Sequence, residues 1–130
     1  MKGVDGWQLS NHPILPSAAH LAALQIFERA GMKNLRKKSE QLTGYLEFIL
    51  NQIDPLHEFF MLLTPKDPKE RGCQLSIYMK NNGRKIFNRI IRSGVIADWR
   101  EPDVIRLAPV PLYNTFEEVF RFGEVLKKAL

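Results

Sequence analysis

Arg106 is the residue of this sequence best suited to bind a small anion. It lies within residues 104–108, which are otherwise apolar, and an extended strand there places Ile105 and Leu107 on one face and Arg106 on the other. A guanidinium among apolar residues suits a carboxylate, because the two planar groups form two parallel hydrogen bonds. The same pattern fits an arginine on the solvent face of an edge strand, and the residues alone favour this second interpretation.

Other polar or nucleophilic side chains give weaker signals. Asn11 precedes a proline-rich turn, where an amide usually satisfies local backbone groups. Cys73 begins a predicted strand, and an isolated cysteine is more often a small buried side chain than a nucleophile. His12, His20 and His57 lack the spacing of metal ligands. The sequence therefore predicts no metal site.

Recognised catalytic motifs are missing from the sequence. Glu117 and Glu118 fall in the first turn of a predicted helix, where acids interact favourably with the helix dipole, so they do not read as a catalytic pair. There is no glycine-rich phosphate loop, no Gly-x-Ser-x-Gly elbow and no His-Glu-x-x-His motif. No residue of the chain is assigned a catalytic role.

A basic segment suggests a different class of function, a standalone nucleic-acid-binding module. No acid occurs between Gly72 and Ala97, and one helix face in this segment is rich in lysine and arginine, as in proteins that contact phosphates. A solvated helix face explains the same residues, and no aromatic stacking platform is interleaved with the charges. The basic residues are Lys80, Arg84, Lys85, Arg89 and Arg92.

Composition limits the class of protein. The 130 residues are 45% hydrophobic and 25% charged, which is typical of one ordinary globular core. The net charge of +5 permits anionic partners without requiring them. The single cysteine excludes an intramolecular disulfide and favours a reducing compartment. No stretch approaches the roughly 18 apolar residues of a membrane span, so we expect a soluble, cytoplasmic protein.

Hydrophobic periodicity predicts two helices in the first part of the chain. Two prolines within residues 10–16 favour an extended entry, and Ser17 is positioned to cap the first helix, residues 18–30. Apolar residues surround most of this helix, which predicts burial on several sides. Residues 33–52 form a second helix with one apolar face.

Shorter elements follow Pro55. The alternation within residues 73–79 is typical of a strand with one buried face, and Thr115 and Glu118 form a capping-box pattern for a final helix. The order of elements predicts an α+β fold, a small, largely antiparallel sheet covered by helices. The predicted strands are residues 58–64, 73–79, 95–99 and 104–110, and the predicted helices are residues 84–92 and 116–128.

Four segments together resemble kynureninase: residues 8–15, 35–47, 71–76 and 100–114. The resemblance covers nearly the whole chain but only the C-terminal part of that enzyme. It implies that residues 1–130 are a single C-terminal small domain of a fold-type I enzyme, the aspartate-aminotransferase type, and that the large cofactor-binding domain is absent. It also makes a nucleic-acid partner or a membrane partner unexpected.

The resemblance implies an activity for the parent enzyme. Kynureninase is a homodimeric hydrolase that depends on pyridoxal phosphate and cleaves L-kynurenine, or 3-hydroxykynurenine, into anthranilate, or 3-hydroxyanthranilate, and L-alanine. This reaction belongs to tryptophan catabolism and NAD biosynthesis. The lysine that binds the cofactor covalently lies in the large domain, and no lysine here has a matching context. We therefore expect the chain alone to be inactive.

Two site residues follow from the resemblance. Arg106 matches the arginine that holds the substrate's α-carboxylate, which reverses the preference drawn from the residues alone. Asn11 matches an asparagine that contacts the cofactor. His12 departs from the family motif, which has a second proline at that position.

Overall fold

The computed structural model describes residues 3–7 and 10–130. It contains two compact units, Met1–Met32 and Lys33–Leu130. None of the helices in the described residues is long and apolar enough to cross a membrane.

The first unit contains a short 3-10 helix, η1 (Val4–Trp7), and helix α1 (Ile14–Ala30). Helix α1 begins earlier than predicted and includes Pro16 in its first turn, where the N–H that proline lacks has no intrahelical partner in any case. Helix α1 ends at Ala30, as predicted. Gly31 terminates it with a φ of 76°, and the Gly31 N–H donates to the carbonyl of Phe27 at 2.9 Å.

The burial predicted for the first helix is wrong for this chain. No residue of α1 is buried, and several of its leucine and isoleucine side chains are more than half exposed. The physical reason lies in its own unit, where the other element described is a single 3-10 turn. One such turn cannot cover a helix that is apolar on several sides.

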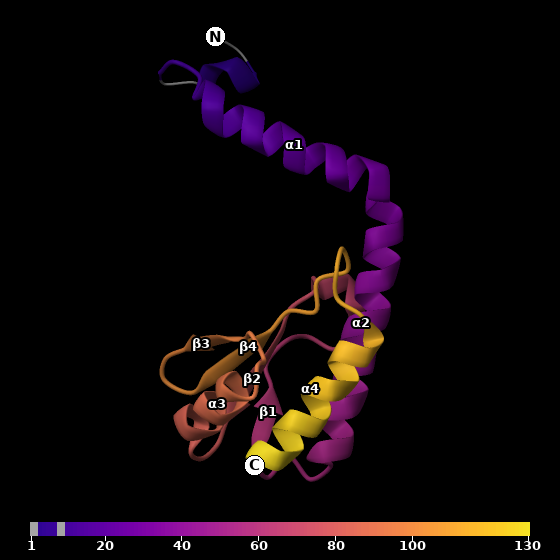
Figure 1. Cartoon of the computed structure of the whole chain (residues 1–130), viewed down its shortest axis with the longest axis vertical. Coiled ribbons are helices and arrows are strands. Elements are labelled where there is room, and N and C mark those ends of the chain that lie inside the picture. The colour runs from indigo at the N-terminus through magenta and orange to yellow at the C-terminus, as the bar shows by residue number, and fades with distance from the viewer. Residues whose placement is uncertain (1–2, 8–9) are drawn as a thin grey trace. The chain divides into compact units, whose positions relative to one another are not determined.

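The second unit is the predicted α+β fold (Figure 1). Its sheet has the strand order β1-β2-β4-β3, and every neighbouring pair is antiparallel. Its elements are α2 (Met32–Ile53, whose first residue belongs to the first unit), β1 (Phe60–Leu62), η2 (Pro68–Glu70), β2 (Leu75–Met79), α3 (Gly83–Arg92), β3 (Asp98–Arg100), β4 (Val104–Leu107) and α4 (Phe116–Ala129).

One face of the sheet packs against α2, α3 and α4. Leu75, Ile77 and Met79 alternate along β2 with partly exposed residues, as predicted, and they are almost completely buried. They belong to one core cluster with buried residues of all three helices. The opposite face of the sheet, called the open face below, has no buried residue among Met61, Ser76, Tyr78, Asp98, Arg100, Val104 and Arg106.

The strands are shorter than predicted. Residues 104–110 yield a strand that ends at Leu107, because Pro109 and Pro111 have no N–H to donate to a neighbouring strand. Strand β3 starts three residues later than predicted, and Ile96, which was assigned to it, is fully exposed.

Three polar side chains fix the ends of elements in the second unit. Asp54, after α2, accepts hydrogen bonds from the backbone N–H groups of residues 58–60 at 2.7–2.9 Å. Burial raises the pKa of the Asp54 carboxyl, but the three hydrogen bonds outweigh burial and the net pKa lies below its ordinary 3.8. Thr115 and Glu118 form the predicted capping box at the start of α4.

Candidate functional site

Arg106 lies on the open face, at the middle of the sheet. Its strand, β4, has β2 on one side and β3 on the other, so the edge-strand interpretation is wrong. The register places Ser76 and Asp98 directly beside it on the two neighbouring strands. The Arg106 side chain is 33% exposed, so it is partly open to solvent.

Asp98 binds this guanidinium. Arg106 Nε donates to Asp98 Oδ2 at 2.6 Å, and Nη2 contacts the same oxygen. Arg100 Nε lies 3.1 Å from that oxygen as well. One carboxylate oxygen is thus shared by two arginines. Arg100 lies on the same strand as Asp98, whereas the pair of Asp98 and Arg106 lies across neighbouring strands, where opposite charges are stabilising.

The cluster of Arg100, Arg106 and Asp98 can bind an anion. Two guanidinium groups and one carboxylate leave one positive charge. Arg106 Nη1 has no hydrogen-bond partner among the described residues, so the edge of the guanidinium formed by Nη1 and Nη2 remains open to a second carboxylate. Arginine offers five donors in a planar fork, which suits bidentate binding of this kind.

Sequence reasoning missed Asp98, although a signal was present. In a hairpin whose turn covers residues 101–103, Arg100 pairs with Val104 and Asp98 with Arg106. Residues on one face of a hairpin are therefore found by counting outward from the turn. The predicted strand of residues 95–99 contained Asp98 but left this pairing unexamined.

Asn11 belongs to the first unit, Met1–Met32. It is exposed and lies in the bend before α1. An exposed amide in that position is able to donate and accept hydrogen bonds, but no observation tests the predicted contact with a cofactor.

The remaining candidates are not gathered into a site by the fold. Cys73 is a free, partly buried cysteine in the bend before β2. No cluster of histidine, cysteine and acidic residues able to hold a metal ion occurs among the described residues. Of the basic segment, Arg84 lies over the rings of Phe87 and Trp99, and Arg89 donates to a carbonyl at the end of α4.

Arg71 begins one of the segments that resemble kynureninase, and its side chain is buried in contacts within the domain. Its side chain is 3% exposed and its Nη1 lies 2.6 Å from Glu47 Oε2 on α2. The same nitrogen donates to the carbonyl of Pro65. These contacts tie the loop before β2 to α2, and nothing in the sequence pattern predicted the pairing.

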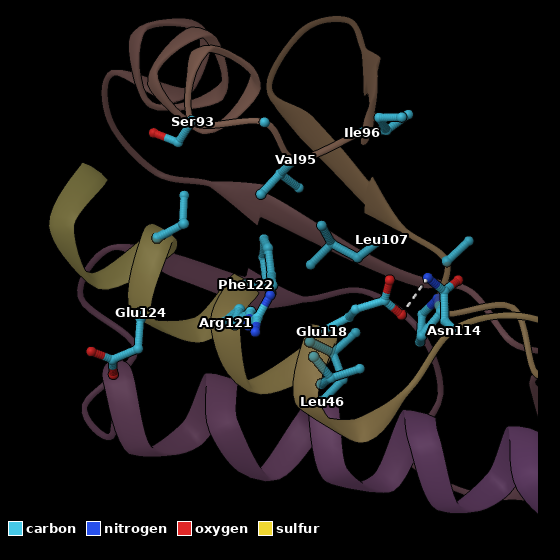
Figure 2. Close-up of a pocket in the computed structure, with 15 residues that line it drawn as sticks. Leu46, Ser93, Val95, Ile96, Leu107, Asn114, Glu118, Arg121, Phe122 and Glu124 are labelled. Atoms are coloured by element: carbon cyan, nitrogen blue, oxygen red, sulfur yellow. Dashed lines mark hydrogen bonds between the residues drawn. The ribbon is translucent and has the colours of Figure 1, made fainter.

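The second unit also has a groove whose lining does not include Arg106. This groove of about 670 Å³ lies between α4 and the segments that follow α3 and β4 (Figure 2). Leu46, Leu107 and Phe122 line it, while Glu118 accepts a hydrogen bond from Asn114 at its rim. Leu107 belongs to the core face of the sheet, so the groove and the open face are separate surfaces.

Comparison with known proteins gives one consistent family. A family model for the kynureninase C-terminal domain matches residues 35–126. Kynureninase from Flavobacterium psychrophilum is 50% identical over 129 residues, which are 98% of this chain and 30% of that protein. Kynureninase from Myxococcus xanthus is 47% identical over 127 residues, 98% of this chain and 29% of that protein.

A solved structure agrees with this family at the level of the fold. It comes from work on the directed evolution of transaminases by ancestral reconstruction, and it matches with a TM-score of 0.70 at 26% identity. The match covers 99% of this chain and 29% of that chain. The chain thus spans about 30% of the length of the relatives that it matches.

Proposed function

This chain belongs to the kynureninase family, as its C-terminal domain, and from that premise we propose that it holds the substrate's carboxylate in an enzyme that hydrolyses L-kynurenine. The observation that carries the proposal is the open edge of the Arg106 guanidinium, in a cluster with one unneutralised positive charge. No observation favours the nucleic-acid-binding alternative.

The role of Arg106 is to bind and orient. A substrate carboxylate seated on Nη1 and Nη2 is fixed in its plane, which fixes the direction of the neighbouring α-carbon. Orientation of this kind contributes to catalysis because the reacting groups are already placed when the reaction begins. Each charge-assisted hydrogen bond contributes about 1.5–3 kcal/mol.

The described residues fit one part of a pyridoxal phosphate site. Asn11 is able to hydrogen-bond to the cofactor, but every lysine among the described residues is at least partly exposed, whereas a lysine that forms a Schiff base is usually activated by desolvation. When bound, the cofactor serves as an electron sink for the substrate. The chain's own contribution is therefore substrate orientation, and we expect no hydrolysis by the chain alone.

The finer assignments rest on the family. The name of the relatives, kynureninase, supports kynurenine as the substrate. From the family resemblance we extend the proposal to 3-hydroxykynurenine as a substrate, to anthranilate or its 3-hydroxy form and L-alanine as products, and to a place in tryptophan catabolism and NAD biosynthesis. We extend the proposal to a cytoplasmic homodimer that depends on pyridoxal phosphate.

A chimera tests the proposal. This chain replaces the matching 129 residues of the Flavobacterium psychrophilum enzyme, and anthranilate release is measured with kynurenine as substrate. The chimera is expected to hydrolyse kynurenine. Arg106→Lys removes one of two hydrogen bonds and should lower kcat/KM about 10- to 150-fold, equivalent to about 1.5–3 kcal/mol.

Arg92→Lys on the exposed surface of α3 is the matched control and should leave kcat/KM unchanged. A second substrate sharpens the result, because the decarboxylated analogue of kynurenine has no group for Arg106 to hold. Its inhibition constant should be the same in the parent chimera and in Arg106→Lys. An unchanged kcat/KM for kynurenine in Arg106→Lys would remove Arg106 from the substrate site.

A further inference from the structure

We infer that Asp98 is a positioning residue, which holds Arg106 in the orientation that presents the Nη1 edge to the substrate carboxylate. The inference rests on the proposed function of Arg106. It adds a residue whose effect on the substrate is indirect, because Asp98 contacts the arginine rather than the bound carboxylate.

The geometry separates the two edges of the guanidinium. Nε and Nη2 of Arg106 both face Asp98 Oδ2. Because the group is planar, these contacts fix the plane and leave Nη1 at the far end. An arginine with free side-chain torsions would have to lose that freedom when substrate binds, whereas Arg106 is already restrained.

Arg106 and Asp98 lie on strands with different positions in the sheet. Arg106 is on β4, which has a neighbouring strand on both sides, and Asp98 is on the edge strand β3. The register puts their backbones directly opposite. The hairpin therefore sets the separation of the two side chains without any contribution from the substrate.

Arg100 prevents Asp98 from neutralising the site. If Asp98 contacted Arg106 alone, the pair would carry no net charge and an incoming carboxylate would compete with Asp98. Because Arg100 Nε shares the same oxygen at 3.1 Å, the cluster keeps a positive charge while Arg106 stays oriented. The two roles, orientation and competition, predict opposite effects of removing Asp98.

The kinetic test uses the chimera described above with Asp98→Ala, Asp98→Asn and the control Asp103→Ala. Loss of orientation should raise KM for kynurenine about tenfold in Asp98→Ala, with kcat changed by less than about threefold. Asn keeps a carbonyl oxygen that can accept from Nε, so Asp98→Asn should recover most of the lost affinity. Asp103→Ala makes the same change of charge in the same hairpin, and its KM should match that of the parent chimera.

The decarboxylated analogue of kynurenine separates positioning from a loss of structure. Its inhibition constant should not change in Asp98→Ala, because that analogue does not use Arg106. A lower KM for kynurenine in Asp98→Ala would show competition, and an equal loss of affinity for kynurenine and the analogue would show general damage. Either result overturns the inference.

A second measurement needs no catalysis. In nitrogen-15 spectra of the 130-residue chain, the Arg106 Nε–H is expected to exchange with water at least about tenfold faster in Asp98→Ala than in the wild type. Equal exchange rates would contradict the inference. Its failure is distinguishable from failure of the proposed function: if Arg106→Lys impairs the chimera and Asp98→Ala does not, Arg106 keeps its role and Asp98 loses its own.

Discussion

The close approach of α2 and α4 at Gly123 gives a sharp prediction about packing. A Cβ added at Gly123 would lie 2.5 Å from Ile49 Cγ2. Ile49 is buried and β-branched, and its Cγ2 is attached directly to Cβ, so this methyl group cannot move away without a change of χ1 or of the helix itself. Gly123→Ala should therefore force the two helices apart.

The expected magnitude is a balance of two terms. Replacing a glycine inside a helix with alanine stabilises by about 1 kcal/mol, and overpacking a core costs about 1–3 kcal/mol. We expect Gly123→Ala to lower the free energy of unfolding by about 1 kcal/mol, since the clash involves a restrained methyl group. Gly44, exposed in α2 with nothing within 4 Å of its added Cβ, supplies the matched control, and Gly44→Ala should stabilise by about 0.5–1 kcal/mol.

Equilibrium urea unfolding of the 130-residue chain, followed by far-UV circular dichroism, measures both variants. Ile49→Ala removes the obstructing methyl group, so it should cost about 1–2 kcal/mol less in the Gly123→Ala background than in the wild type. If Gly123→Ala stabilises the chain as much as Gly44→Ala does, the close approach inferred at this position is refuted.

Three further predictions concern buried and capping side chains, each measured by urea unfolding. Asp54→Asn should lower the free energy of unfolding by about 1–3 kcal/mol at neutral pH. Because folding lowers the pKa of Asp54, the wild type should lose this advantage as the pH falls below 3.8. A difference in unfolding free energy that widens at low pH would contradict the lowered pKa of Asp54. Thr115→Ala should cost about 1 kcal/mol by removing the oxygen that accepts from the Glu118 N–H, and no change would mean that the cap is dispensable. Glu47→Ala should cost about 3 kcal/mol because it leaves the Arg71 guanidinium buried without its carboxylate, and a loss below 1 kcal/mol would indicate that water replaces the pair.

Helices of the second unit could be predicted almost to the residue. Helix α2 was expected over residues 33–52 and spans Met32–Ile53, and α4 was expected to end one residue before its observed end. Their apolar residues recur at helical spacing over many turns, which makes the pattern unambiguous. Thr115 also marked the start of α4, because its hydroxyl was expected to cap the helix. In the structure this hydroxyl accepts a hydrogen bond from the Glu118 N–H.

The strand boundaries and the exposure of α1 were predicted less accurately than the helices of the second unit. Apolar runs such as residues 95–99 do not show where pairing begins, because pairing depends on the neighbouring strand and its register. Burial of α1 was inferred from its own apolar residues, but burial requires a surface to pack against, and the first unit offers none large enough.

The candidate site was predicted in part. Period-two alternation put Arg106 on the face opposite Ile105 and Leu107, and the structure confirms that face. Its pairing with Asp98 is a contact across two strands, which alternation within one strand cannot reveal. The roles of Arg106 and Asn11 in binding substrate and cofactor stay predictions.

The length of the turn between β3 and β4 affects the ion pair of Asp98 and Arg106, because that turn sets the register of the two strands. Exposed turns usually accept insertions, because extra residues there disturb few contacts. Here, a single residue added among residues 101–103 would shift the pairing of Asp98 with Arg106, and a one-residue slip turns a side chain to the other face of a sheet. The number of residues in that turn therefore constrains the charge cluster as strictly as the identity of its arginines does, although no turn residue belongs to the cluster.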